Sequence, residues 1–103
     1  MPSEAVIVRF KYGKSDKDPL YELEEKIAEA VEDSGAGEYD GHELAMDDSE
    51  GYLLLFGPDA RAIFDAIEPE LAKVRFMRGC QVELCFGDHQ DEETEREIFT
   101  YGK

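Results

Sequence analysis

Residues 52–71 read YLLLFGPDARAIFDAIEPEL, and they contain a strand followed by a helix. The apolar run YLLLF is typical of a short buried strand, and Gly57-Pro58 ends it. Asp59 then supplies a side chain suited to cap the start of a helix. Because Pro69 lacks an amide donor, we expect it to break or kink this helix near Ile67. One face of the predicted helix is apolar: Ala60, Ile63, Phe64, Ile67 and Leu71.

A strand, a helix and a second strand precede this unit. Residues 4–12 (EAVIVRFKY) are β-branched and aromatic, and we expect a central strand because both of its faces are partly apolar. An amphipathic helix follows, with Asp18-Pro19 as its cap and first residue and Gly35 at its end. Residues 38–47 give a weaker strand signal, and the turn chemistry of residues 48–51 joins them to YLLLF as a hairpin.

Two further segments follow the second helix. Residues 80–86 alternate as a strand, and residues 96–101 (REIFTY) are a candidate extra strand. The order β-α-β-β-α-β predicts an α+β fold, a ferredoxin-like two-layer sandwich whose two helices cover one sheet face. A two-layer unit with a different strand order is the alternative. We expect one domain over residues 1–103, with its core in residues 4–87 and an acidic loop and short C-terminal segment in residues 88–103. The predicted core face of the first and last main strands is Val6, Val8, Phe10, Val82, Leu84 and Phe86.

Two short motifs carry a resemblance to known proteins. They are GEYDG at residues 37–41, followed by His42-Glu43, and FGPDA at residues 56–60, which leads into a helix with a late proline. Over roughly residues 5–87 the chain resembles small uncharacterised acidic bacterial proteins of ferredoxin-like fold. The resemblance implies the fold, and the family brings no established activity.

The charge of the chain narrows the classes of partner. There are 26 acidic and 11 basic residues, so the formal net charge is −15. Nucleic-acid binding needs clustered Lys and Arg for phosphate contacts, and anionic membrane surfaces repel an acidic chain, so we expect neither partner. A protein partner, including a basic one, is compatible with this charge.

The cysteines and the N-terminus indicate a cytoplasmic protein. If residues 80–86 form a strand, Cys80 and Cys85 point to opposite faces and lie too far apart for a disulfide. Reduced thiols are typical of the cytoplasm. The first residues, MPSEAVIV, lack the basic region and the long apolar run of a signal peptide.

The strongest polar cluster is the segment from Glu38 to Glu43. If the segment is extended, Glu38, Asp40 and His42 alternate onto one face, about 6–7 Å apart between successive members. Two carboxylates and an imidazole could bind a divalent metal or perform acid-base chemistry. The simpler interpretation is a turn or bulge between two glycines with solvated side chains, and we favour it. We therefore expect no bound metal and no cofactor, and we assign no catalytic residue. The candidate polar site is Glu38, Asp40, His42 and Glu43.

The sheet face away from the helices is the candidate interaction surface. We expect it to carry an apolar patch large enough to bind a protein or a second copy of the chain. The candidate interface residues are Ile7, Leu53, Leu55 and Cys85.

A group of basic residues should lie on two neighbouring strands of such a sheet. Arg9 and Lys11 belong to the first strand, and residues 73–78 supply a lysine and two arginines just before the last. These cations could bind an anionic ligand, or they could pair internally with Glu83 and other carboxylates, which we favour.

Three functional hypotheses follow. The first is a non-enzymatic acidic module that binds or regulates another protein. The second is a small-ligand or metal-dependent enzyme centred on residues 38–43. The third is a structural homodimer through the open sheet face. Because no nucleophile motif or phosphate-binding loop occurs in the sequence, we favour the first and expect no enzyme.

Overall fold

The computed structural model of the chain describes residues 4–13, 16–46, 49–88 and 90–102. The predicted α+β class and the order β-α-β-β-α-β are confirmed, and so is the extra strand at the end. The elements are β1 (Glu4–Lys11), α1 (Asp18–Asp33), β2 (Glu38–Leu44), β3 (Glu50–Gly57), α2 (Ala60–Ala72), the 3-10 helix η1 (Arg75–Met77), β4 (Cys80–Cys85) and β5 (Arg96–Tyr101).

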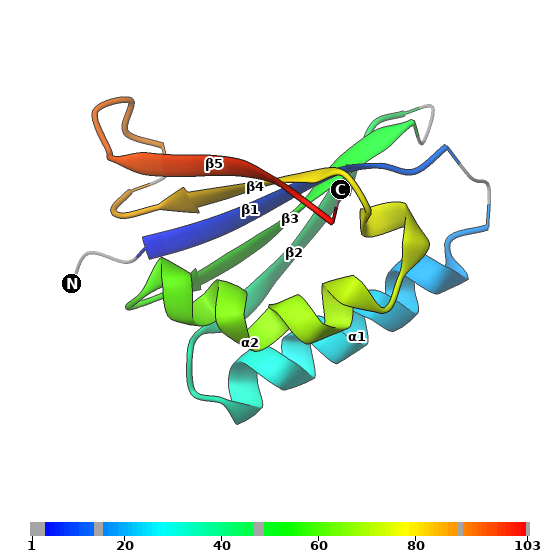
Figure 1. Ribbon diagram of the computed structural model, residues 1–103, viewed down its shortest axis with the longest axis horizontal. Coiled ribbons are helices and arrows are strands. Elements are labelled where there is room, and N and C mark those ends of the chain that lie inside the picture. The colour runs from blue at the N-terminus through cyan, green and yellow to red at the C-terminus, as the bar shows by residue number, and fades with distance from the viewer. Residues whose placement is uncertain (1–3, 14–15, 47–48, 89, 103) are drawn as a thin grey trace.

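The five strands form one antiparallel sheet in the order β2-β3-β1-β4-β5. β1 is central, as its two partly apolar faces predicted. Both helices lie side by side on the same face of the sheet, and the opposite face carries no helix in the part of the chain that the structure describes (Figure 1). The molecule is therefore two-layered, with one sheet face covered and one open.

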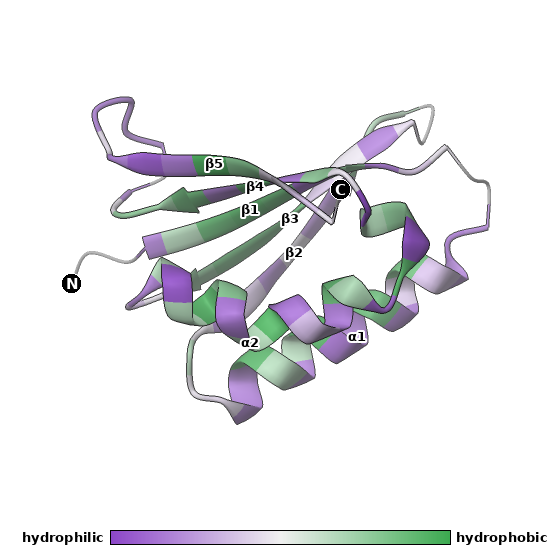
Figure 2. Ribbon diagram, in the orientation of Figure 1, coloured by the Kyte–Doolittle hydropathy of each residue, from purple (hydrophilic) through white to green (hydrophobic). Residues whose placement is uncertain are grey.

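The main core lies between the sheet and the two helices. Alternate residues of β1 and β4 point into it, and the apolar stripe of each helix faces them (Figure 2). Five of the six predicted core positions on the strands are confirmed: Val6, Val8, Phe10, Val82 and Leu84. The prediction that Phe86 is the sixth core position is wrong. β4 ends at Cys85, and Phe86 lies beyond the sheet with 36% of its surface exposed.

The side chains of β3 that lie on the open face differ from those predicted. Leu53 pairs with Val8 and Leu55 with Val6, so both leucines share the covered face with those valines and are fully buried. They are core residues, and their assignment to the interface was wrong. Leu54, from the middle of the same run, takes the open face instead.

β5 is attached to the sheet edge by backbone pairing and by aromatic contacts. Phe99 and Tyr101 point toward the helices, where both rings stand edge-on to Phe64 of α2, with ring centroids 5.3 and 5.8 Å apart. Edge-to-face contacts of this kind add to the stability gained by burying the rings.

The helix ends agree only partly with the prediction. Asp59 caps α2 as expected, and its carboxylate accepts hydrogen bonds from the amides of Arg61 and Ala62. α1 begins one residue earlier than predicted, since Lys17 is the cap and Asp18 is already helical. Gly35 has a φ of +73°, the left-handed conformation predicted for the end of α1.

Pro69 does not end α2. The helix continues through the proline to Ala72. Ile67 and Leu71 lie on either side of Pro69 in the sequence, and both are buried in the core while Pro69 itself is exposed. Packing of these two side chains holds the last turn in place, although one backbone hydrogen bond is missing there.

Candidate functional site

A β-bulge breaks the predicted row of polar side chains on β2. The register shifts between Tyr39 and Gly41, and Gly41 adopts a φ of +127°. Glu38 pairs with Phe56 on the open face, whereas His42 pairs with Leu53 on the covered face. The expected alternation of Glu38, Asp40 and His42 onto one face is therefore wrong, and the simpler interpretation as a bulge is confirmed.

His42 contacts a carboxylate that the sequence did not single out. Its Nδ1 lies 2.5 Å from Oε1 of Glu24 on α1, and the hydroxyl of Tyr39 donates to the same oxygen. Burial, followed by the hydrogen bond to Glu24, raises the pKa of Tyr39 above its ordinary value. Glu24 thus joins edge strand β2 to α1. α1 carries many glutamates, and Glu24 differs from its neighbours in its spacing: it lies four residues after Leu20 and three before Ile27, at the border of the apolar stripe.

Glu43, the last member of the candidate polar site, faces away from this cluster. It pairs with Tyr52 and so lies on the open side of the sheet. Across the described residues, no three His, Cys, Asp or Glu side chains are grouped so that they could hold a metal ion. The four candidate residues therefore do not form one site: Glu38 and Glu43 lie on the open face, His42 lies on the covered face, and Asp40 lies in the bulge.

The open face contains a second, smaller apolar cluster. Ala5, Ile7 and Cys85 are buried at its centre, and three half-buried side chains surround them: Tyr52, Leu54 and Phe56. Ile7 and Cys85 are where the sequence predicted them. Ile98 of β5 extends the apolar surface and is 53% exposed.

A buried carboxylate sits in the middle of this face. Glu83 is only 6% exposed, and both of its oxygens have partners. Oε1 lies 3.8 Å from the Arg9 guanidinium, and Oε2 accepts a hydrogen bond from Arg96. The Arg9–Glu83 pair that we favoured from the sequence is confirmed. Arg96 was missed, because only the pairing of β4 with β5 brings it beside Glu83.

Both cysteine side chains are buried, and they lie on opposite faces as predicted. Cys80 belongs to the main core and Cys85 to the open-face cluster. Burial raises the pKa of each thiol to about 11, although the Arg96 charge opposes the rise at Cys85. Each thiol is therefore protonated at neutral pH and a weak nucleophile.

The side chains of the open face form rows that cross all five strands. Residues paired across neighbouring strands lie on the same face, so each row can be read from the register. The rows are Glu38-Phe56-Ala5-Cys85-Arg96, Gly41-Leu54-Ile7-Glu83-Ile98 and Glu43-Tyr52-Arg9-Gln81-Thr100. Two rows begin with a carboxylate on β2, and the first ends with an arginine on β5. The face therefore carries carboxylates along its β2 edge and one arginine, Arg96, on β5, with apolar side chains and the Arg9–Glu83 pair between them.

Comparison with known proteins identifies no relative: no protein-family model matches the sequence, and no curated protein has significant similarity to it. Within the described ranges, neither helix combines the length and the apolar character needed to cross a bilayer.

Proposed function

We propose that this chain is a non-enzymatic interaction module that binds protein through the open face of its sheet. The observation that carries the proposal is a group of half-buried or exposed apolar side chains around the buried centre of that face, which no helix covers among the described elements: Tyr52, Leu54, Phe56 and Ile98. The element order and the β2-β3-β1-β4 sequence of strands support a ferredoxin-like sandwich, to which β5 adds one edge strand.

The chemistry of the face supports binding rather than catalysis. Leu54 and Phe56 are half-buried and Ile98 is exposed, so this face presents apolar side chains to solvent, as interaction sites do. Glu83 is held by two arginines and is therefore a fixed structural charge. An apolar centre with a rigid polar feature is the arrangement found in protein interfaces.

The charge pattern of the face favours a second copy of the chain as the partner. Two packed sheets keep their strands within about 30° of each other. A twofold axis parallel to the strands and passing beside β1 would then place β2 of each copy over β5 of the other. Glu38 would approach Arg96 of the second copy on both sides of the axis. The net charge of −15 opposes association, but salt screens it beyond about 8–10 Å.

The first test is the mass of the particle in solution. Light scattering in moderate salt should give a dimer for the wild type and a monomer for Leu54→Asp and Ile98→Asp, because each substitution puts a charge into the apolar centre. Tyr21→Asp is the matched control. Tyr21 lies on α1, away from the open face, and its exposed fraction of 48% is close to the 53% of Ile98. A wild type that stays monomeric at high concentration rules out the second copy, and a basic protein becomes the expected partner.

The second test separates the specific contact from general charge effects. Glu38→Lys makes the chain less acidic and would strengthen association if only net repulsion mattered. Our geometry predicts the opposite, a dissociation constant raised by about tenfold, because the lysine would face Arg96 of the second copy. Glu25→Lys on the exposed side of α1 changes the net charge equally and should not weaken the dimer. Equal effects of the two substitutions would contradict the proposed orientation.

A further inference from the structure

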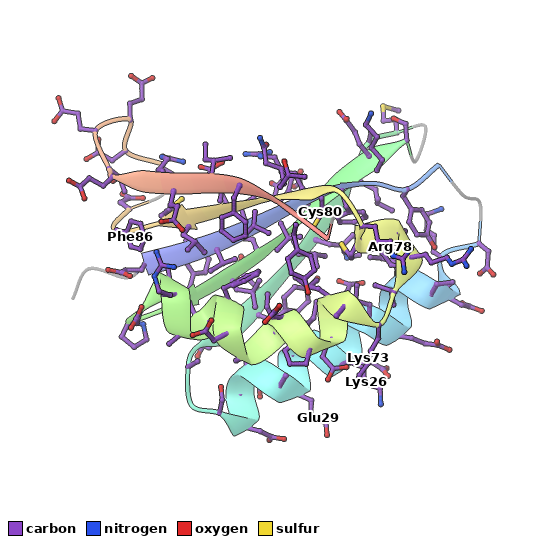
Figure 3. The ribbon with its side chains drawn as sticks, in the orientation of Figure 1. Lys26, Glu29, Lys73, Arg78, Cys80 and Phe86 are labelled. Carbon is purple, nitrogen blue, oxygen red and sulfur yellow. The ribbon has the colours of Figure 1, made fainter. Side chains whose placement is uncertain are left out.

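A cavity of about 600 Å³ opens at one end of the sheet. Its walls come from the end of β1, the end of β2, the start of β3, and the segment that runs from η1 into β4. Figure 3 shows Arg78 beside Cys80 at this end, while Phe86 lies at the other end of β4. The volume is within the range of small-molecule sites, which is about 300–1,000 Å³.

The wall of the cavity is basic although the chain is acidic. Four of the 11 Lys and Arg residues of the chain line it: Arg9, Lys11, Arg75 and Arg78. Among the described residues, two carboxylates, Glu43 and Glu50, also line it. Among the described residues of this wall, cations therefore outnumber carboxylates, whereas carboxylates outnumber cations more than twofold in the chain as a whole. Such a local reversal of sign concentrates anions from solution.

Three of these four side chains are not engaged in an ion pair among the described residues. Arg9 is paired with Glu83, but Lys11, Arg75 and Arg78 form no ion pair within the described ranges of the chain. Arg61 and Lys73, which lie outside the cavity, are both paired with a carboxylate. Like charges held together without partners repel each other, so a bound anion would relieve this repulsion. Arginine side chains suit a compact oxyanion because each guanidinium can donate two parallel hydrogen bonds.

The cavity also has an aromatic wall. Phe76 of η1 and Tyr52 of β3 both line it. The Phe76 ring is held by Tyr12 and Phe10, with centroids 5.2 and 5.9 Å away, so its position is fixed before any ligand arrives. The Arg9 guanidinium lies over the Tyr52 ring, and its central carbon, Cζ, is 5.7 Å from the ring centroid. An apolar or planar group could pack against these rings.

We propose that this cavity binds a small organic phosphate. The doubly charged phosphate group lies among Lys11, Arg75 and Arg78, and the organic part packs against Phe76, the ring on the η1 side of the sheet. A phosphate monoester places two negative charges on one compact group, which matches three cations around one hollow better than a single carboxylate does.

The experiment is a calorimetric titration with three probes. We expect phenyl phosphate to bind the wild type most tightly, inorganic phosphate more weakly because it lacks the ring, and benzoate hardly at all because it carries one charge. Arg75→Gln and Arg78→Gln should each weaken phenyl phosphate binding by about tenfold. Arg61→Gln is the matched control, since Arg61 is exposed and distant from the cavity wall, and its affinity should equal that of the wild type.

Two results would overturn the proposal: no heat of binding with either phosphate at millimolar concentration, or an equal loss in Arg61→Gln and Arg75→Gln. Backbone amide shifts of the wild type on adding phenyl phosphate give a readout that needs no variant, and they should concentrate at residues 9–11 and 75–81. Arg9, Glu43, Tyr52 and Gln81 lie on the open face and also line the cavity, so a dimer through that face would partly cover it. The titration of Ile98→Asp separates the two proposals, because Ile98 lies on that face but does not line the cavity. A monomeric Ile98→Asp that still binds phosphate supports the cavity whatever the oligomeric state.

Discussion

Leu53 and Leu54 are adjacent leucines of β3 that the sheet turns to opposite faces. Leu53 pairs with Val8 and is completely buried beneath the helices, whereas Leu54 pairs with Ile7 and is half-buried on the open face. The run YLLLF is apolar at every position, so its own alternation could not separate the two faces. The pairing with β1 separates them, because Arg9 belongs to the open side of that strand.

Truncating these two leucines should have unequal effects. Leu53→Ala removes a side chain from a closed core and leaves a cavity, so we expect the free energy of unfolding to fall by about 2–5 kcal/mol. Leu54→Ala removes a half-exposed side chain and should cost about 1 kcal/mol. Urea unfolding measured on dilute monomer compares them, and Leu55→Ala should resemble Leu53→Ala. Equal losses for Leu53→Ala and Leu54→Ala would contradict the register of β3.

α2 is an element in which tertiary packing overrides local preference. Pro69 cannot donate a hydrogen bond to the carbonyl of Asp65, and a proline inside a helix costs about 3 kcal/mol relative to alanine. The helix persists because Ile63, Ile67 and Leu71 bury one continuous stripe against the sheet. The proline occupies the exposed side of the helix.

Replacing this proline should therefore stabilise the protein. Pro69→Ala restores an amide donor within α2, and we expect the free energy of unfolding to rise by about 1–3 kcal/mol, the gain being reduced by the greater freedom of the unfolded chain. Pro58→Ala is the control, because Pro58 precedes the helix and its replacement restores no helical hydrogen bond. Thermal unfolding of the two variants measures the difference. A Pro69→Ala variant that is less stable than the wild type would mean that the proline fits its turn without strain.

The charge of the whole molecule is repulsive at long range although its visible ion pairs are attractive. The net charge is −15 on a chain whose Cα radius of gyration is 12.9 Å. The screening length falls from about 30 Å at 10 mM salt to about 10 Å at 100 mM, so across this range salt removes repulsion between distant carboxylates. The Glu83 carboxylate is buried, so salt weakens its two arginine pairs less.

Stability should therefore rise with salt. Between about 10 and 200 mM sodium chloride, we expect the free energy of unfolding of dilute monomer to increase by roughly 1 kcal/mol. Urea midpoints at the two salt concentrations measure it, and an unchanged or falling midpoint would mean that the arginine pairs of Glu83 outweigh the global repulsion. Chloride is the suitable anion for this measurement, because phosphate would add any stabilisation from the basic cavity.

Much of the architecture follows from the sequence alone. The β-α-β-β-α-β order, the central position of β1 and the buried faces of β1 and β4 all depend on local periodicity and on turn residues such as Gly35 and Asp59. These signals act between residues a few positions apart, so they survive in a single sequence. The acidic excess is likewise a property of the sequence itself, because it depends only on which residues occur. The grouping of Arg9 and Lys11 with Arg75 and Arg78 also needs β1 and β4 to be neighbours, which the predicted strand order supplied.

The tertiary structure alone decided which side chains meet. The face taken by Leu53, the bulge that divides residues 38–43, and the contacts of Glu24 with His42 and of Arg96 with Glu83 all depend on strand register or on packing between distant elements. In an all-apolar strand, the sequence does not show which alternate residues face the core. A one-residue bulge also moves every later side chain of its strand to the opposite face. Register is set by hydrogen bonds to the neighbouring strand, and those partners are far away in the sequence.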